Sequence, residues 1–258
     1  MIIKNKAELA TTEIRSVALE IIEAGISRVL PSVIMPAAVS YDRNHRVLIV
    51  NGDIFHVSGG RIFVIGGGKA SGLMAENLEN ILGTETITDG LVACKDNAYN
   101  TGRIRIIRSS HPVPGQNGVE AVRQMLHLKE QYSIDGNDTV LCLISGGGSA
   151  LMPYPAEGIS LQDKQAVTRL LLGSGADINE INAVRKHLSG VKGGRLGHYL
   201  APARVISLIL SDVIGNDLST IASGPTFPDS STFADAYGIL GKYKLLADTP
   251  DSVVELLE

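Results

Sequence analysis

The sequence predicts an α/β protein built around a doubly wound, mostly parallel β-sheet with helices on both faces. Short runs rich in Val and Ile recur along the 258 residues, and several are too uniformly apolar to have a solvated face. Segments with helical periodicity lie between these runs, and strands that alternate with helices form βαβ units. Hydrophobic residues make up 44% of the chain and charged residues 19%, which excludes extensive disorder.

The elements follow in order from the same periodicities. The first is an amphipathic helix over residues 7–30, which Pro31 is expected to end. Six apolar runs are predicted strands: 46–50, 61–66, 90–94, 103–110, 139–145 and 204–211. Helical patterns follow the second, fourth and fifth runs, at residues 69–82, 117–132 and 161–175. A last helix is expected within residues 243–258, and the sequence leaves open whether it docks on the sheet or leads into a further domain.

Charge, hydropathy and cysteine usage limit the location and the partners. A formal net charge of −4 provides no overall positive field for nucleic acid. No stretch approaches the roughly 18 apolar residues of a membrane span, and the opening residues do not resemble a secretory signal. Cys94 and Cys142 lie in apolar runs and are interpreted as core residues in a reducing compartment. We therefore expect a cytoplasmic protein that binds neither nucleic acid nor membrane; its oligomeric state is open, a homodimer included.

Two glycine-rich segments follow predicted strands and favour a phosphate site. Bare backbone N–H groups, the start of a helix and an ammonium group together suit a phosphate, whereas the alternative is a tight turn with nothing bound. The first segment, "VIGGGKASG", fits neither the Walker A loop nor the dinucleotide fingerprint. The second lacks the G-x-S-x-G elbow, so its serine is interpreted as a hydrogen-bonding residue and not a nucleophile. The candidate residues are Gly66, Gly67, Gly68 and Lys69 in the first segment and Ser145, Gly146, Gly147, Gly148 and Ser149 in the second.

A third strand exit, "LILSDVIGNDLSTIASGPTFPD", carries carboxylates. Asp212 falls at the end of the apolar run, where it could hold Mg²⁺ or accept a proton from a substrate hydroxyl. Asp217 is a weaker metal candidate. The alternative for both is an Asx turn or a helix cap. His111, in "SSHPVPG", is expected to make a structural hydrogen bond.

Basic residues gather in "NEINAVRKHLSGVKGGRLG". Lys192 and Arg195 flank a Gly-Gly pair, where a phosphate or a carboxylate could be held, and Arg185 lies just before them. Glu157, in the Pro-containing loop after the second glycine-rich segment, is a further candidate for substrate binding. The alternative for the basic residues is a solvated helix face.

Five segments together resemble the type-2, MOFRL-containing glycerate kinases: "GGGKASG", "SSHPVPG", "SGGGSALMPYPAEGIS", "NEINAVRKHLSGVKGGRLG" and "SDVIGNDLSTIASGPT". The resemblance runs from about residue 10 to the C-terminus. It implies ATP-dependent phosphorylation of D-glycerate, usually to 2-phosphoglycerate, with Mg²⁺ as the metal. The family's loop lysine corresponds to Lys69 and its "SDV" aspartate to Asp212. On this hypothesis Arg185, Lys192 or Arg195 hold the substrate carboxylate or the nucleotide phosphates.

The resemblance also implies that residues 1–258 form the Rossmann-like N-terminal domain of such a kinase. The match ends before the family's C-terminal MOFRL domain, so an arginine of that domain has no counterpart here. Two alternatives stay open: an NAD(P)H-dependent hydroxypyruvate reductase, and a fragment that binds ATP or glycerate without catalysis. The missing dinucleotide fingerprint argues against the reductase.

Overall fold

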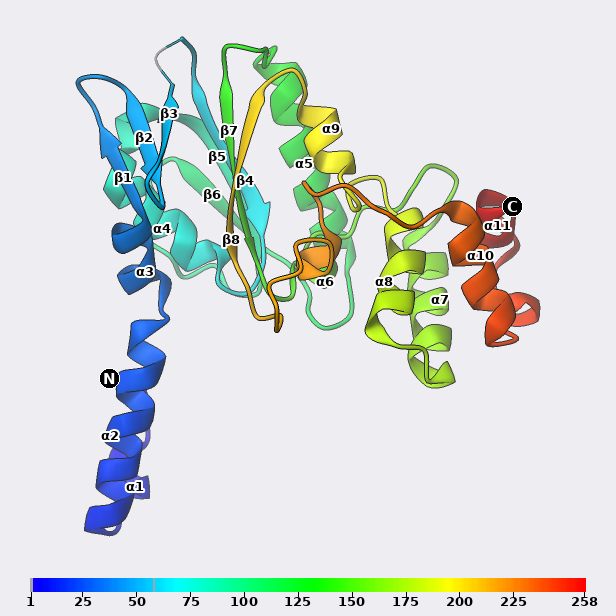
Figure 1. Ribbon diagram of the computed structural model, residues 1–258, viewed down its shortest axis with the longest axis horizontal. Coiled ribbons are helices and arrows are strands. Elements are labelled where there is room, and N and C mark those ends of the chain that lie inside the picture. The colour runs from blue at the N-terminus through cyan, green and yellow to red at the C-terminus, as the bar shows by residue number, and fades with distance from the viewer. Residues whose placement is uncertain (1, 58) are drawn as a thin grey trace.

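A five-stranded parallel sheet forms the centre of the computed structural model, which describes residues 2–57 and 59–258 (Figure 1). The strand order is β6-β5-β4-β7-β8. The strands are β4 (Ile62–Gly67), β5 (Ile87–Cys94), β6 (Ile104–Arg108), β7 (Thr139–Ser145) and β8 (Arg204–Leu210). All five were predicted from apolar runs, and the predicted fold class is confirmed.

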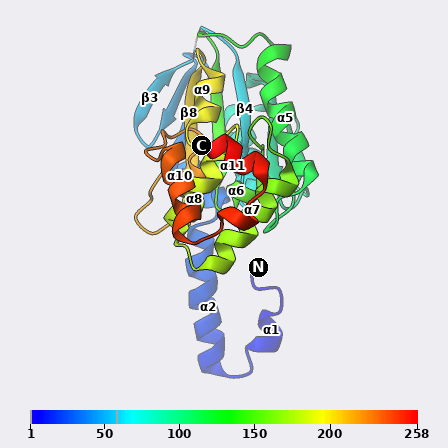
Figure 2. The same ribbon diagram turned by 90° about the vertical axis from the view of Figure 1, so that its right-hand side faces the viewer.

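Helices cover both faces of this sheet. One face carries α3 (Pro31–Ala38) and α4 (Ser71–Leu82), and the other carries α5 (Gln116–Gln131) and α9 (Arg195–Leu200). Along β4, Phe63 and Ile65 enter the core under α5, whereas Ile62 and Val64 enter the core under α4. Figure 2 shows β3 and α5 on opposite sides of β4. Because both faces are covered, the central strands are buried along their whole length.

A second, antiparallel sheet packs over the α3 and α4 face. It consists of β1 (Val39–Asp42), β2 (Val47–Val50) and β3 (Asp53–His56). The strand predicted over residues 46–50 is therefore present as β2, but it lies in this antiparallel sheet and not in the parallel one. β2 and β3 are joined by Asn51 and Gly52, whose φ angles of 50° and 90° suit the two-residue turn of a hairpin. The Asn-Gly pair is a local sequence signal for a hairpin, and a prediction based on longer apolar runs does not use it.

The N-terminal helix is interrupted where one continuous helix was predicted. α1 (Lys6–Leu9) ends before Thr12, whose side chain accepts a hydrogen bond from Arg15 N at 3.3 Å and starts α2 (Glu13–Arg28). Pro31 does not end α2; it begins α3, at the first helical position, where its missing N–H costs nothing. α2 projects away from the sheet and buries no residue (Figure 1).

Four helices beside the sheet form a separate helical lobe. We use this name for α7 (Leu161–Ser174), α8 (Ile178–His187), α10 (Phe233–Lys242) and α11 (Asp251–Leu257), which share their own apolar core. Capping boxes begin α7, α8 and α10 at Ser160, Asp177 and Thr232. The C-terminal helix expected within residues 243–258 spans only its second half and docks in this lobe. Shorter elements are α6 (Gly148–Leu151), η1 (Thr84–Thr86), η2 (Ile221–Ser223) and η3 (Leu246–Asp248). None of the described helices is long and apolar enough to cross a membrane.

Candidate functional site

The two glycine-rich segments lie side by side at the carboxyl edge of the sheet. β4 and β7 are neighbouring parallel strands, with Gly67 opposite Ile144, so their exits emerge together. The backbone N–H of Lys69 donates to Gly146 O at 2.9 Å and links the two exits directly. Ligands of open α/β sheets bind beyond this edge. The two segments that were assigned to one phosphate site from the sequence are therefore neighbours in the fold.

Close approach between the two strands explains the glycines. Gly68 has a φ angle of 154°, and a Cβ atom there would overlap the side chain and the carbonyl of Ser145. Ser145 in turn fastens the first turn of α4. Its Oγ accepts a hydrogen bond from Ala70 N at 3.0 Å and lies 3.1 Å from Ser71 Oγ. A buried side chain of β7 thus fixes where α4 begins relative to the glycine-rich exit.

Three polar side chains gather on the Gly146–Gly147 turn. A Cβ atom at Gly147, whose φ angle is 82°, would lie 3.1 Å from Lys69 Cε and 3.1 Å from His111 Cδ2. A Cβ atom at Gly146 would overlap the carboxylate of Asp212, which is itself exposed. Asp212 reaches this turn because β8 pairs with β7 and ends beside it. An ammonium, an imidazole and a carboxylate therefore surround one stretch of bare backbone.

The electrostatics of this turn affect His111. Burial lowers the pKa of His111, and the ammonium groups of Lys69 and Lys95 lower it further. The imidazole is therefore neutral at pH 7 and able to donate or accept a hydrogen bond. The sequence analysis assigned His111 a structural role; the structure places it beside Lys69.

A chain of hydrogen bonds lies on the other side of the second glycine-rich segment. Ser149 Oγ is 2.6 Å from Ser223 Oγ, which lies 3.3 Å from Asn182 Oδ1 on α8. Ala222 and Ser223 have left-handed φ angles of 52° and 60°, which non-glycine residues seldom adopt. The sequence analysis missed Ser223 and Asn182 as site residues. The turn-forming residues Gly224 and Pro225 after Ser223 were the sequence feature that marked this loop.

The basic segment is less exposed than a solvated helix face. Lys192 is fully buried, and its Nζ contacts only Met152 O at 3.5 Å and Ala222 O at 3.4 Å. Arg195 is partly buried and donates to Lys186 O at 2.6 Å and to Ser189 O at 2.5 Å. Lys186 forms an ion pair with Asp229 at 3.2 Å.

Two candidates lie apart from this arrangement. Glu157 is exposed in the loop between α6 and α7. Asp217 is occupied in its own turn, where its carboxylate accepts hydrogen bonds from Ser219 and Thr220 at 2.6 to 2.9 Å. These bonds lower the pKa of Asp217 and fit the Asx-turn alternative. The described residues contain no group of three His, Cys, Asp or Glu side chains arranged to hold a metal.

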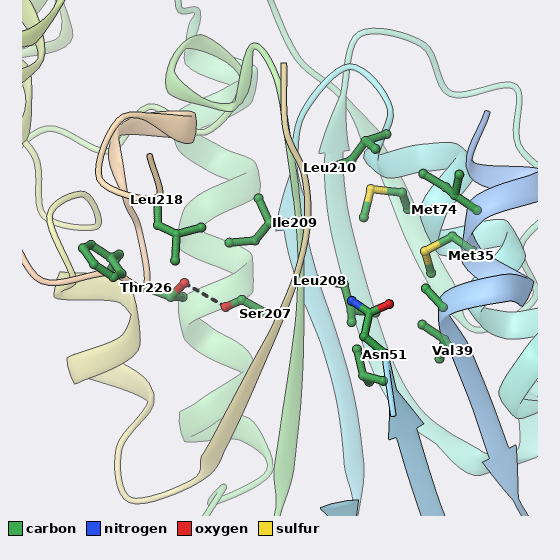
Figure 3. Close-up of a pocket in the computed structure, with 14 residues that line it drawn as sticks. Met35, Val39, Asn51, Met74, Ser207, Leu208, Ile209, Leu210, Leu218 and Thr226 are labelled. Carbon is green, nitrogen blue, oxygen red and sulfur yellow. Dashed lines mark hydrogen bonds between the residues drawn. The ribbon is translucent and has the colours of Figure 1, made fainter. Parts of the chain in front are cut away.

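An apolar cavity of about 510 Å³ lies elsewhere, between the edge strand β8 and α3 (Figure 3). Met35, Met74, Leu208 and Leu210 line it, and an Oγ–Oγ1 hydrogen bond of 2.8 Å between Ser207 and Thr226 crosses one end. It contains none of the titratable candidates. Lys69, His111 and Asp212 lie instead at the carboxyl edge of the sheet.

Comparison with known proteins identifies the family of the chain. The model of the family described as a domain of unknown function, DUF4147, matches residues 17–258. The chain belongs to the DUF4147 family. A D-glycerate 2-kinase from Thermotoga maritima is 46% identical over 196 residues, which cover 75% of this chain and 46% of the relative. A putative hydroxypyruvate reductase from Agrobacterium vitis is 48% identical over 187 residues, 72% of this chain and 48% of the relative.

A solved structure shows the same fold. The crystal structure of glycerate kinase from Thermotoga maritima superposes with a TM-score of 0.77 at 39% identity, covering 93% of this chain and 54% of that one. The predicted resemblance to glycerate kinases is thus confirmed. This member of the DUF4147 family spans about half the length of the curated relatives that it matches.

Proposed function

We propose that the protein catalyses ATP-dependent phosphorylation of D-glycerate, with 2-phosphoglycerate as the product. The observation that carries the proposal is the gathering of Lys69, His111 and Asp212 on the Gly146–Gly147 turn, where two glycine-rich strand exits meet. The relatives named glycerate kinase support it. Phosphoryl transfer needs mainly positioning and charge neutralisation, which such a turn provides.

Each group has a role in this reaction. The amides of Gly146, Gly147 and Gly148 and the Lys69 ammonium orient the transferring phosphoryl group and balance its negative charge. Asp212 orients the C2 hydroxyl of glycerate and accepts its proton as the oxygen attacks. Neutral His111 supplies a hydrogen bond at the turn without competing with Lys69 for the anion.

The donor set fits one Mg²⁺ ion held mainly by the nucleotide. Mg²⁺ in kinases commonly takes one or two carboxylates, with phosphate oxygens and waters completing its shell. Asp212 is an exposed carboxylate at this edge, whereas Asp217 is engaged in its own turn. Asp212 would therefore be the protein ligand, and the ion would neutralise phosphate charge.

Product analysis tests the proposal directly. The chain is incubated with Mg-ATP and D-glycerate and followed by ³¹P NMR; a parallel sample contains hydroxypyruvate and NAD(P)H and is followed by cofactor absorbance. We expect a new phosphomonoester signal whose proton coupling identifies the C2 position, and no cofactor oxidation. Lys69→Ala is expected to lower kcat/KM by about 10² to 10³. Asp212→Asn is expected to act mainly on kcat.

Matched controls are Lys4→Ala and Asp53→Asn, because both residues are exposed and belong neither to the parallel sheet nor to its strand exits. Hydroxypyruvate reduction without phosphorylation would support the reductase alternative. Binding of Mg-ATP without any product would instead support a binding fragment. Wild-type turnover in either site variant would remove that residue from the reaction.

A further inference from the structure

A group of buried cations lies at the junction of the sheet and the helical lobe. Lys164 on α7, Arg185 on α8 and Lys192 after α8 are close enough that each positive charge disfavours its neighbours. The acidic residue of this region, Asp229, is held by Lys186 at 3.2 Å and by Ser231 at 2.8 Å. Buried charge without a counter-charge is costly unless an anion joins it. A bound anion would therefore stabilise this group of cations.

Two cations of this region are already satisfied by backbone carbonyls. Lys164 Nζ donates to Arg185 O at 3.0 Å and to Leu188 O at 2.8 Å, where it caps the end of α8. Arg195 donates to two further carbonyls of the same turn. Both hold the backbone in place, so neither is free to bind an anion.

Arg185 differs from both. Its Nε is buried and has no hydrogen-bond partner among the described residues, and burial lowers the pKa of its guanidinium. Asn182 lies three residues earlier, on the same face of α8, and approaches Ser223. Arg185 also lies close enough to Lys192 to lower its pKa, and Lys192 Nζ approaches the carbonyl of Ala222, the residue before Ser223. An unpaired guanidinium on this face of α8 is suited to a planar oxyanion.

We propose that Arg185, with the hydroxyls of Ser149 and Ser223, binds the carboxylate of the acceptor substrate, and that Lys192 is a positioning residue behind it. This inference rests on the proposed function. The opposite side of the same segment already offers Lys69 and bare amides for the phosphoryl group. Anchoring the carboxylate on one side and the phosphoryl group on the other leaves the adjacent C2 hydroxyl between them, near Asp212.

Lys192 makes this binding depend on pH. Burial, and to a smaller extent the nearby Arg185, together lower the pKa of Lys192 to about 7. The cations near it are Arg185 from α8 and Lys164 from α7, and Arg195 from α9 is close to Lys164. The carboxylate of Asp229 faces the next residue, Gly193, and is engaged by Lys186 and Ser231. Below pH 7 its ammonium favours a bound carboxylate, and above pH 7 that contribution is lost. Affinity for the carboxylate therefore falls as pH rises through about 7.

Calorimetric binding to the full chain without nucleotide tests the carboxylate site. The probes are D-glycerate and D-glyceramide, which replaces the carboxylate by a neutral amide. We expect the wild type to prefer D-glycerate, and Arg185→Gln to weaken D-glycerate binding about tenfold or more while leaving D-glyceramide unchanged. Arg185→Lys should restore part of the preference. The matched control is Arg169→Gln, an exposed arginine on α7.

A pH series on Lys192→Met isolates the second part. The wild-type affinity should decrease through pH 7, whereas the variant should show a flat profile with weaker binding at pH 6. A variant profile that falls like the wild type overturns the role of Lys192, because removal of a merely structural lysine would not flatten it. Thermal unfolding of each variant identifies any loss of folded protein.

The remaining outcomes separate this inference from the proposed function. Equal affinity of the wild type for D-glycerate and D-glyceramide, or unchanged preference in Arg185→Gln, overturns the carboxylate site. If Arg185→Gln instead loses binding of inorganic phosphate, the cations serve the nucleotide and the inference is wrong. Carboxylate preference without phosphoryl transfer leaves this inference standing and contradicts the kinase. Phosphoryl transfer with a wild-type KM for D-glycerate in Arg185→Gln supports the kinase and contradicts the carboxylate site.

Discussion

At the residue scale, Gly146 connects the fold to the chemistry. It is half-buried, and only the missing side chain leaves room for the carboxylate of Asp212. Deleting the Asp212 carboxylate tests whether it is needed, whereas moving it tests whether its position is needed. A substitution at Gly146 moves the Asp212 carboxylate without changing any titratable group.

We predict that Gly146→Ala displaces Asp212 and lowers kcat by about 10², because a small misplacement of a reacting group costs that much. Stability should change by less than about 1 kcal/mol, since the displaced carboxylate is exposed. Gly173→Ala is the control: no atom lies within 4 Å of a Cβ there, and its position in α7 should gain up to about 1 kcal/mol. Wild-type kcat in Gly146→Ala would show that the position of Asp212 does not limit the reaction.

At the element scale, the join between β7 and α4 sets the geometry of both glycine-rich exits. Ser145 is the last residue of β7, and its hydroxyl contacts the N-cap residue of α4, Ala70, and its first residue, Ser71. Removing the hydroxyl leaves the Ala70 N–H without this acceptor in a partly buried place. The loss of this hydrogen bond destabilises the segment that carries Lys69.

We predict that Ser145→Ala lowers the free energy of unfolding by about 1–3 kcal/mol, the cost of leaving a buried polar group unsatisfied. The control, Ser230→Ala, lies at an exposed position and should change it by less than about 0.5 kcal/mol. Urea denaturation of the two variants measures the difference. Equal midpoints would mean that the Ser145 hydroxyl does not fasten α4.

The same scale explains what the sequence could predict. Interior strands were recognisable because burial on both faces leaves runs of apolar residues, as in residues 140–144. Lys69 and Asp212 were recognisable because each comes two residues after an apolar strand, the interior strand β4 for Lys69 and the edge strand β8 for Asp212. Ser223 and Asn182 were not, since their contact joins residues 41 positions apart and leaves no local pattern. For the same reason the sequence could not separate Arg185 from Arg195, which differ only in their tertiary partners.

At the scale of the whole molecule, the candidate site is shared between two bodies with different cores. The two glycine-rich segments belong to the sheet, whereas Asn182 and Arg185 belong to the helical lobe (Figure 1). Two interactions join the bodies. One is an isolated antiparallel β-bridge between Pro155 and Ser189, and the other is the hydrogen bond from Ser223 to Asn182. Opening of the helical lobe would therefore disrupt carboxylate binding before it affects the phosphate-binding segments.

This arrangement predicts that the helical lobe unfolds as its own unit. Leu240→Ala removes a fully buried side chain of α10 and should cost about 2–5 kcal/mol, because a cavity remains in the core of the lobe. Hydrogen exchange should then quicken in α7, α8, α10 and α11, while β4 and β7 keep their protection. Leu91→Ala, in the core of the sheet, is the matched control and should quicken exchange in the strands. A uniform loss of protection in both bodies after Leu240→Ala would show one cooperative unit, and carboxylate and phosphate binding would then weaken together.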